Sequence, residues 1–191
     1  MAHSIRRHHI LVNPQKTGKN GSSLRVLLHT AASAVRNFLH QNTVLAIALA
    51  AARAYDAVGG SLLHIQMVMN GGMYKNAFSC AIPGTEELGC EMAAALGALG
   101  GDWKLGLEVL KNIDANHVAQ AKALSIPIEI EVDETKDSIY IYAEVTTTKG
   151  VGLCRIEDFH ANIVYVAKDD EVLFEAEKTE AAAAKADIID F

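Results

Sequence analysis

A histidine and an asparagine lie two residues apart in the segment DFHANIV, where one run of apolar residues ends and the next begins. An imidazole can take up or release a proton near neutral pH, and a nearby amide can hold a substrate in place. His160 is therefore a candidate catalytic acid or base, and Asn162 is a candidate substrate contact. The same two residues are also typical of a purely structural turn, so both interpretations stay open.

A lysine and an asparagine, Lys75 and Asn76, follow the turn signal Asn70-Gly71-Gly72. We expect them in a turn between two strands. There the ammonium group could hold a substrate carboxylate, and the amide could donate hydrogen bonds to it. A solvated loop lysine and an ordinary turn asparagine are the alternative.

The turn Pro83-Gly84-Thr85 precedes a predicted helix. Backbone N–H groups at the start of a helix have no acceptor within it, and they bind anions such as carboxylates. Gly84 and Thr85 are therefore candidate substrate-binding residues. A plain capped turn is the competing interpretation.

The three cysteines are widely spaced and form no CxxC pair, which favours a reducing compartment over a disulfide framework. A thiolate at Cys90, within a predicted helix of small residues, could ligate iron. A single cysteine there also suits a small core side chain. Cys80 and Cys154 fall on predicted strands and have the same alternative. We assign no metal ligand in this chain.

The net charge, the length of the apolar runs and the absence of several motifs exclude further classes of function. The 191 residues carry a net charge of −6, whereas nucleic-acid binders usually have a basic face, so we expect no nucleic-acid partner. The most apolar run, residues 44–52, is far shorter than the ~20 residues of a membrane span, so we expect a cytoplasmic protein with no membrane partner. The sequence has no P-loop, GxGxxG, HExxH or GxSxG motif.

Helical periodicity dominates the first part of the chain. We predict helices over residues 24–39, over 44–57 with Thr43 as cap, and over 86–99 with Thr85 as cap. Two more helices should follow the caps Asp102 and Asp114. In the helix after Asp102, we expect Leu105, Val109 and Leu110 to point into the core. Alanine and glycine fill residues 93–101, which predicts close packing of backbones. Gly100-Gly101 should end that helix.

The period then changes from helical to two, although the first two strands lie among the helices. Strands are predicted over residues 62–68, 77–82, 126–132, 138–146, 151–157, 163–167 and 171–174, with hairpin turns at 149–150 and 168–170. Helices in the first part and strands in the second predict an α+β fold with a largely antiparallel sheet in two layers. We divide the chain into an arm (1–23), a single domain (24–176) and a helical tail (177–191).

Several segments resemble one family in the same order. They are IALAAARAY (47–55), the turn with Lys75-Asn76, IPGT (82–85), AAALGALGG (93–101), GLEVLK (106–111), AKAL (121–124) and HANIV (160–164). Over roughly residues 43–174 the chain resembles the N-terminal part of the L-cysteine desulfidase family, also called UPF0597. That family is related to the alpha chain of the iron–sulfur L-serine dehydratases. AAALGALGG followed by GLEVLK is the most specific part of the likeness.

The resemblance implies α,β-elimination from a small amino acid. L-Cysteine would give pyruvate, ammonia and sulfide, and L-serine would lose water instead. In the family a [4Fe-4S] cluster with one open iron is the Lewis acid, while a base removes the α-proton. Five residues of this chain fall on family motifs and could line the substrate side: Lys75, Asn76, Thr85, His160 and Asn162.

Two departures from the family bear on that activity. Family members carry a Gly-Cys-Thr-Glu-Pro motif whose cysteine is an expected cluster ligand, and Gln41 stands at the cysteine's position here. An amide does not replace a thiolate as a cluster ligand. Family members are also more than twice as long, with further ligand cysteines in their C-terminal half.

Two hypotheses follow from the resemblance and its departures. The first is a truncated family member that has no cluster of its own and little or no lyase activity alone, and that works with a complementary C-terminal subunit. The second is a non-catalytic module that binds a small carboxylate and assembles into a homo-oligomer.

Overall fold

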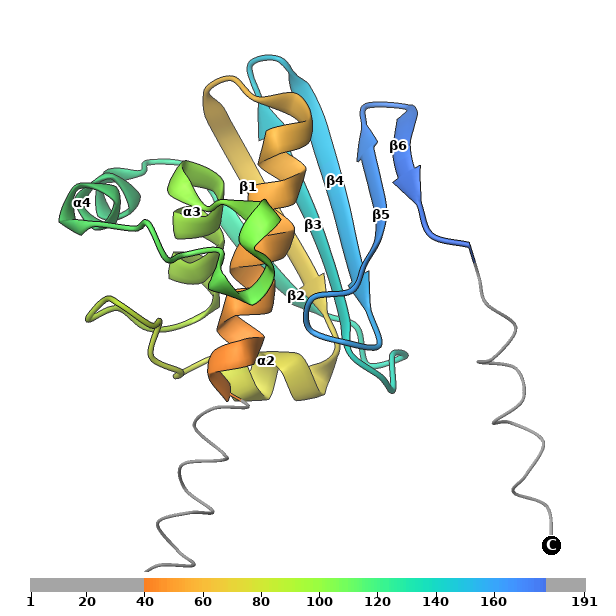
Figure 1. Cartoon of the computed structure of the whole chain (residues 1–191), viewed down its shortest axis with the longest axis horizontal. Coiled ribbons are helices and arrows are strands. Elements are labelled where there is room, and N and C mark those ends of the chain that lie inside the picture. The colour runs from red at the N-terminus through yellow and green to blue at the C-terminus, as the bar shows by residue number, and fades with distance from the viewer. Residues whose placement is uncertain (1–39, 178–191) are drawn as a thin grey trace, which may run out of the picture. The chain divides into compact units, whose positions relative to one another are not determined.

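The computed structural model describes residues 40–177, which lie in one compact unit (Figure 1). The predicted arm over residues 1–23 and the predicted helix over 24–39 lie outside the described residues. The predicted tail over 177–191 also lies outside them, apart from its first residue.

Six strands form one sheet in the spatial order β2-β1-β3-β4-β5-β6. Their bounds are β1 (Leu62–Met69), β2 (Ile128–Val132), β3 (Tyr140–Thr147), β4 (Gly150–Glu157), β5 (Ile163–Lys168) and β6 (Glu171–Glu175). β1 and β2 run parallel, whereas every other neighbouring pair is antiparallel. The predicted α+β fold with a largely antiparallel sheet is confirmed.

Alternating side chains give the sheet one buried face. In β3 the residues Ile141, Ala143 and Val145 are fully buried, and the residues between them are half-buried. Strand register places Met67 of β1 and Cys154 of β4 on either side of Ala143. A period of two thus sends one set of apolar side chains to a common core.

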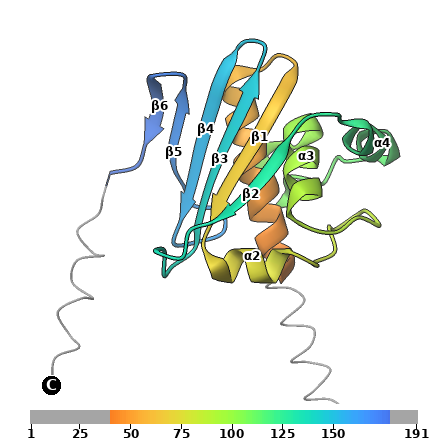
Figure 2. The same cartoon turned by 180° about the vertical axis from the view of Figure 1, so that it is seen from behind.

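The helices cover that buried face. A helix over residues 40–58, orange in Figure 1, lies across the sheet, with α3 (Cys90–Gly100) beside it and α4 (Ala115–Ala123) next to α3. Figure 2, from the opposite side, shows the sheet in front of these helices. The predicted two layers are therefore present. No helix among residues 40–177 combines the length and apolar character needed to cross a bilayer.

Small residues let the elements of this fold approach closely. A Cβ at Gly97 of α3 would lie only 2.8 Å from the Cα of Ala48, and a Cβ at Gly152 of β4 would lie 2.9 Å from the carbonyl carbon of Ala54. Only glycine fits at either place, because real Cβ atoms do not come so near to backbone atoms. The close packing predicted from the alanine- and glycine-rich segment is confirmed, and its partner is the helix over residues 40–58.

The prediction for residues 70–82 is wrong. The residues that we expected in a turn form a short helix, α2 (Gly71–Ala77), so Lys75 and Asn76 lie on a helix. The expected strand over 77–82 is reduced to a single bridge between Ala81 and Leu88. Asn70, a residue type common at helix N-caps, stands at the N-cap of α2 but makes no side-chain cap hydrogen bond, and the two glycines that follow it are also typical of a turn.

The predicted start of the small-residue helix is also wrong. α3 begins at Cys90 rather than at residue 86. Residues 80–89, here called the 80–89 loop, fold back on themselves instead. The Gly89 N–H donates to the Cys80 carbonyl (3.1 Å), and the Ile82 N–H donates to the Glu87 carbonyl (2.9 Å). Gly84 and Thr85 therefore do not lie at a helix N-terminus.

Two of the predicted helix caps are present. The Asp114 carboxylate accepts the backbone N–H groups of Asn116 and His117, each at 3.0 Å, at the start of α4. The Asp102 carboxylate accepts the Lys104 N–H (3.1 Å). Gly101 follows α3 in an extended conformation, as predicted for the end of that helix.

Two details near these caps differ from expectation. The segment after Asp102 is a 3₁₀ helix, η1 (Trp103–Glu108), because Gly106 takes a positive φ of 57° that breaks a regular helix. Val109 and Leu110 are buried as expected, but Leu105 is 38% exposed rather than inward. Thr43 is no cap, since residues 40–42 are already helical and its side chain is buried within the helix.

Candidate functional site

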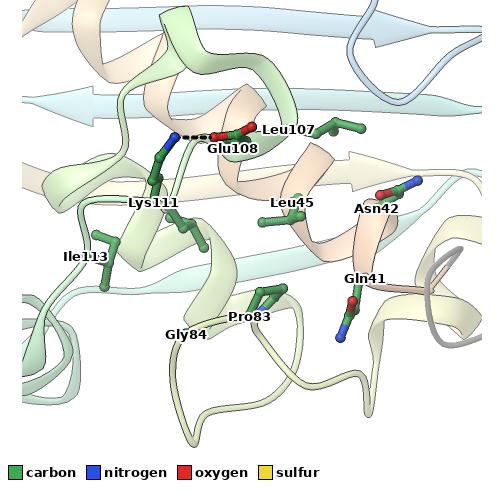
Figure 3. Close-up of a pocket in the computed structure, with 10 residues that line it drawn as sticks. Gln41, Asn42, Leu45, Pro83, Gly84, Leu107, Glu108, Lys111 and Ile113 are labelled. Atoms are coloured by element: carbon green, nitrogen blue, oxygen red, sulfur yellow. Dashed lines mark hydrogen bonds and ion pairs between the residues drawn. The ribbon is translucent and has the colours of Figure 1, made fainter.

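A pocket of about 360 Å³, here called the Gln41 pocket, brings together three segments that are far apart in the sequence (Figure 3). Its lining residues are Gln41, Asn42 and Leu45 from the helix over residues 40–58, Pro83 and Gly84 from the 80–89 loop, and Leu107, Glu108, Leu110, Lys111 and Ile113 from the segment after α3. In Figure 3, Gln41 lies on the side of Pro83, and the Glu108–Lys111 pair lies on the opposite side.

Local structure explains how each wall is held. The 80–89 loop doubles back through its own backbone hydrogen bonds, and Ile82 beside Pro83 is 1% exposed. Val109 is fully buried, and its carbonyl accepts the Asp102 N–H (2.9 Å), which fixes the segment that follows η1. Buried residues therefore hold the 80–89 loop and the segment after η1 against the core, and the polar groups of both segments lie at the protein surface.

The pocket carries one charge of each sign. The Lys111 ammonium donates to the Glu108 carboxylate at 2.7 Å, and both side chains are exposed. This hydrogen bond raises the pKa of Lys111 and lowers the pKa of Glu108, and the attraction between the charges acts in the same direction. Both groups therefore stay charged near neutral pH, and a carboxylate and an ammonium group lie side by side.

The lining does not fit an iron–sulfur cluster. Gln41 and Asn42 offer amides where the family motif has a thiolate, and amides are not cluster ligands. Cys90 and Cys154 are buried elsewhere, and their burial raises the pKa of each thiol to about 12. Within residues 40–177 no three His, Cys, Asp or Glu side chains are grouped to hold a metal ion. That the chain carries no cofactor stays a prediction.

Of the predicted substrate-binding residues, Gly84 lines the Gln41 pocket and Thr85 follows it in the same loop. The Thr85 hydroxyl donates to the Ile82 carbonyl (3.0 Å) and accepts the Glu87 N–H (3.1 Å). Its side chain thus closes the turn that presents Gly84.

The other candidates lie outside the pocket, at one end of the sheet. Asn70, next to α2, donates its backbone N–H to the Tyr140 carbonyl at the start of β3 (3.2 Å), and its side-chain oxygen accepts the Tyr140 N–H (3.3 Å). Asp158, in the turn after β4, donates its N–H to the Ile139 carbonyl (3.0 Å). The segments that carry Lys75 and His160 therefore both attach beside the start of β3.

His160 and Asn162 lie in the turn between β4 and β5, as predicted. The Asn162 side-chain amide donates to the Glu157 carbonyl (2.9 Å), so it holds the turn together. His160 is half-buried, and burial lowers its pKa, which favours the neutral imidazole that a general base requires. Its catalytic role stays a prediction, as do the substrate contacts of Lys75 and Asn76.

Several pocket residues were not among the sequence candidates. Glu108 and Lys111 look like an ordinary surface pair at a spacing of three residues. Gln41 stood out only as a departure from the family motif. The one signal that could have linked them is that GLEVLK is a segment of the resemblance, while Gln41 stands at the position of a family motif that this chain lacks.

Comparison with known proteins supports the UPF0597 part of that resemblance. The chain is 45% identical over 133 residues to a UPF0597 protein of Clostridium botulinum (strain Okra / Type B1), a match that covers 70% of this chain and 31% of the relative. It is 37% identical over 132 residues to one of Actinobacillus pleuropneumoniae serotype 3, covering 68% of this chain and 31% of the relative. It is 33% identical over 135 residues to one of Clostridioides difficile, covering 70% of this chain and 32% of the relative.

The similarity to known proteins is limited to curated relatives and to part of their length. No family model matches the chain, and no solved structure matches it. The chain spans about a third of the length of the curated relatives it matches. Over about 70% of its own length, this chain is a homologue of the UPF0597 proteins.

Proposed function

We propose that this chain binds a small amino acid or carboxylate in the Gln41 pocket. One observation carries the proposal: two segments of the family resemblance and the position of the family's motif cysteine line one pocket. They are the segment of Gln41, the Pro83-Gly84 part of IPGT, and the GLEVLK segment that ends at Lys111. Distant motif segments that meet at one place are typical of a ligand site.

The chemistry of the lining suits a zwitterion. The Lys111 ammonium can donate to a ligand carboxylate, and the Glu108 carboxylate can accept from a ligand ammonium. Because the two groups pair with each other at 2.7 Å, an amino acid would exchange one ion pair for two. The amides of Gln41 and Asn42 supply donors and acceptors for a short polar side chain, and Leu45 and Leu110 give an apolar wall.

A second candidate is the elimination of sulfide from L-cysteine, or of water from L-serine, that the resemblance implies. The observation that favours it is the position of Gln41, at the place of the family's motif cysteine, in the wall of the pocket. Because the donor set does not fit a cluster, we propose that this chain supplies the substrate side alone. The thiolate ligands would come from another polypeptide.

Binding is tested by titration calorimetry of the full chain with L-cysteine, L-serine and pyruvate. We expect Lys111→Met to weaken binding by about tenfold or more, since the ligand carboxylate would lose its charged hydrogen-bond donor. Lys104→Met is the matched control, because Lys104 is exposed and lies outside the lining. Equal losses in the two variants, or no binding of any of the three compounds, would refute the proposed site.

Anaerobic reconstitution with iron and sulfide tests whether the chain completes the elimination alone. We expect no stable brown chromophore and no sulfide release from L-cysteine. Sulfide release that depends on the added iron would show that the chain completes the elimination alone, and would overturn the substrate-side role while leaving the binding result intact.

A further inference from the structure

The face of the sheet that points away from the helices is bare within residues 40–177 (Figure 2). This surface, here called the open face, is formed by the residues of β1 to β4 whose side chains point away from the helix layer. Its central side chains are half-buried rather than fully exposed: Gln66, Val68, Tyr142, Glu144, Leu153 and Arg155. Apolar and aromatic groups in the middle of a sheet face usually pack against a second layer.

Strand register arranges four side chains in a row across the open face. From β2 to β4 the row runs Glu131, Val68, Tyr142, Arg155. A carboxylate stands at one end, a guanidinium stands at the other, and an aliphatic and an aromatic side chain lie between them. The two ends of the row are therefore opposite in charge.

A second row lies two residues away along the strands. From β2 to β4 it runs Glu129, Gln66, Glu144, Leu153. The Tyr142 hydroxyl of the first row donates to the Glu144 carboxylate (3.3 Å), which ties the two rows together. Here an amide in β1 and a carboxylate in β3 occupy the two middle positions.

Arg155 is held in place by its neighbours, yet its hydrogen bonds are incomplete. Its guanidinium carbon lies 5.2 Å from the centre of the Tyr165 ring. Its Nε is shielded from solvent and lies 2.9 Å from a Glu157 carboxylate oxygen, but the angles do not make a hydrogen bond. Arg155 thus already pairs with Glu157 through Nε, and the other edge of a guanidinium can pair with a further carboxylate.

We propose that the open face is a homodimer interface, in which two copies of this chain pack sheet against sheet about a two-fold axis parallel to the strands between β1 and β3. This axis exchanges β2 with β4 and β1 with β3. Glu131 of each copy then faces Arg155 of the other, and Val68 faces Tyr142. In the second row, Gln66 faces Glu144, so an amide donates to a carboxylate.

A second copy fits this face because most pairs across the axis are complementary; in the second row the exposed Glu129, at the β2 edge of the sheet, faces Leu153. A two-fold interface uses the same patch on both subunits, so opposite charges must sit symmetrically about its axis. Facing sheets pack about 10 Å apart with their strands roughly 30° from parallel, which keeps residues of one row near each other at the centre. The proposal does not depend on the ligand of the Gln41 pocket, which the helix layer forms.

Sedimentation velocity of the full chain over a dilution series tests the interface. We expect a species of twice 20.5 kDa for the natural sequence. Glu131→Arg would place like charges opposite Arg155 and should weaken dimerisation at least about tenfold. The double change Glu131→Arg with Arg155→Glu should dimerise more tightly than either single variant. Glu86→Arg, in the exposed 80–89 loop, carries the same charge change and should leave the dimer intact.

Circular dichroism of each variant checks that the fold is kept. A natural chain that stays monomeric up to its solubility limit would refute the interface, and would leave this face to another polypeptide. A dimer that Glu131→Arg and Glu86→Arg weaken equally would place the contact elsewhere on the molecule.

Discussion

At the scale of single residues, glycines decide how closely the helices pack. The alanine- and glycine-rich segment predicted a close approach, and the structure shows Gly97 against the backbone of Ala48. The sequence could not name that partner, because many alanines between residues 46 and 54 have the same size and polarity. Composition thus predicted the kind of contact, and only the fold shows which residues make it.

The variant Gly97→Ala tests this contact. Within an ordinary helix, replacing glycine by alanine stabilises by about 1 kcal/mol. At Gly97 the new methyl group would press on backbone atoms, and overpacking costs about 1–3 kcal/mol. We therefore expect urea denaturation to show a net loss of about 1 kcal/mol in the free energy of unfolding.

The control for Gly97→Ala is Gly72→Ala in α2. A Cβ there would meet only the Asn70 side-chain nitrogen, at 3.3 Å, which can move away. We expect no loss of stability from this change. A gain in stability from Gly97→Ala equal to that from Gly72→Ala would contradict the packing argument.

Two polar residues show why the candidate site was only partly predictable. Thr85 and Asn162 were predicted to contact substrate, but in the structure their side chains form hydrogen bonds within their own turns. Small polar residues suit turns and ligands for the same reason, which is a short side chain with a strong donor or acceptor. Sequence alone cannot separate the two uses.

At the scale of elements, the strands of the sheet and their hairpin turns were predicted well, and the segment over residues 70–89 was not. All six strands lie within two residues of their predicted bounds, because alternating burial leaves a clear period of two. α2 was missed because its opening, Asn70-Gly71-Gly72, is equally typical of a turn. The extra strand predicted at 77–82 was wrong because the 80–89 loop pairs only with itself.

The cap of α4 gives a prediction that depends on pH. Hydrogen bonds from the His117 backbone and side chain lower the pKa of Asp114 in the folded state. A lowered folded-state pKa contributes stability above the unfolded value of about 3.9, and that stability is lost as the pH falls through the folded value. We expect Asp114→Ala to lower Tm at pH 7, and the difference from the natural sequence to shrink below about pH 4.

The matched variant is Asp114→Asn, which keeps a good capping side chain without the charge. Its Tm should stay close to that of the natural sequence at pH 7, and its own dependence on pH should lack the Asp114 contribution. A difference for Asp114→Ala that persists unchanged at low pH would show that the charge of the cap is unimportant.

At the scale of the whole molecule, the Gln41 pocket could not be derived from any one segment. Gly84 was named as a binding residue and Gln41 as a departure from a motif, without a reason to join them. Their meeting depends on how the helix over residues 40–58 crosses the sheet and on where the 80–89 loop turns back. Such long-range placement has no local signature in the sequence, in contrast to a strand or a cap.

The parallel pair of β1 and β2 has a consequence for the order of folding. β1 ends at Met69 and β2 begins at Ile128, and the chain between them forms α2, α3, η1 and α4. Closing so long a loop has a larger entropic cost than closing the short turns that join β3 to β6. We expect pulse-labelled hydrogen exchange during refolding to protect the amides of β3 and β4 before those of β2.

Simultaneous protection of β2 and β3 would contradict this order. Two walls of the Gln41 pocket, the 80–89 loop and the segment after η1, belong to the same long connection between β1 and β2. The meander of β3 to β6 is then the early, self-sufficient part of the molecule, and the pocket is completed late. A ligand bound there would stabilise the long connection between β1 and β2, which is the last loop to close.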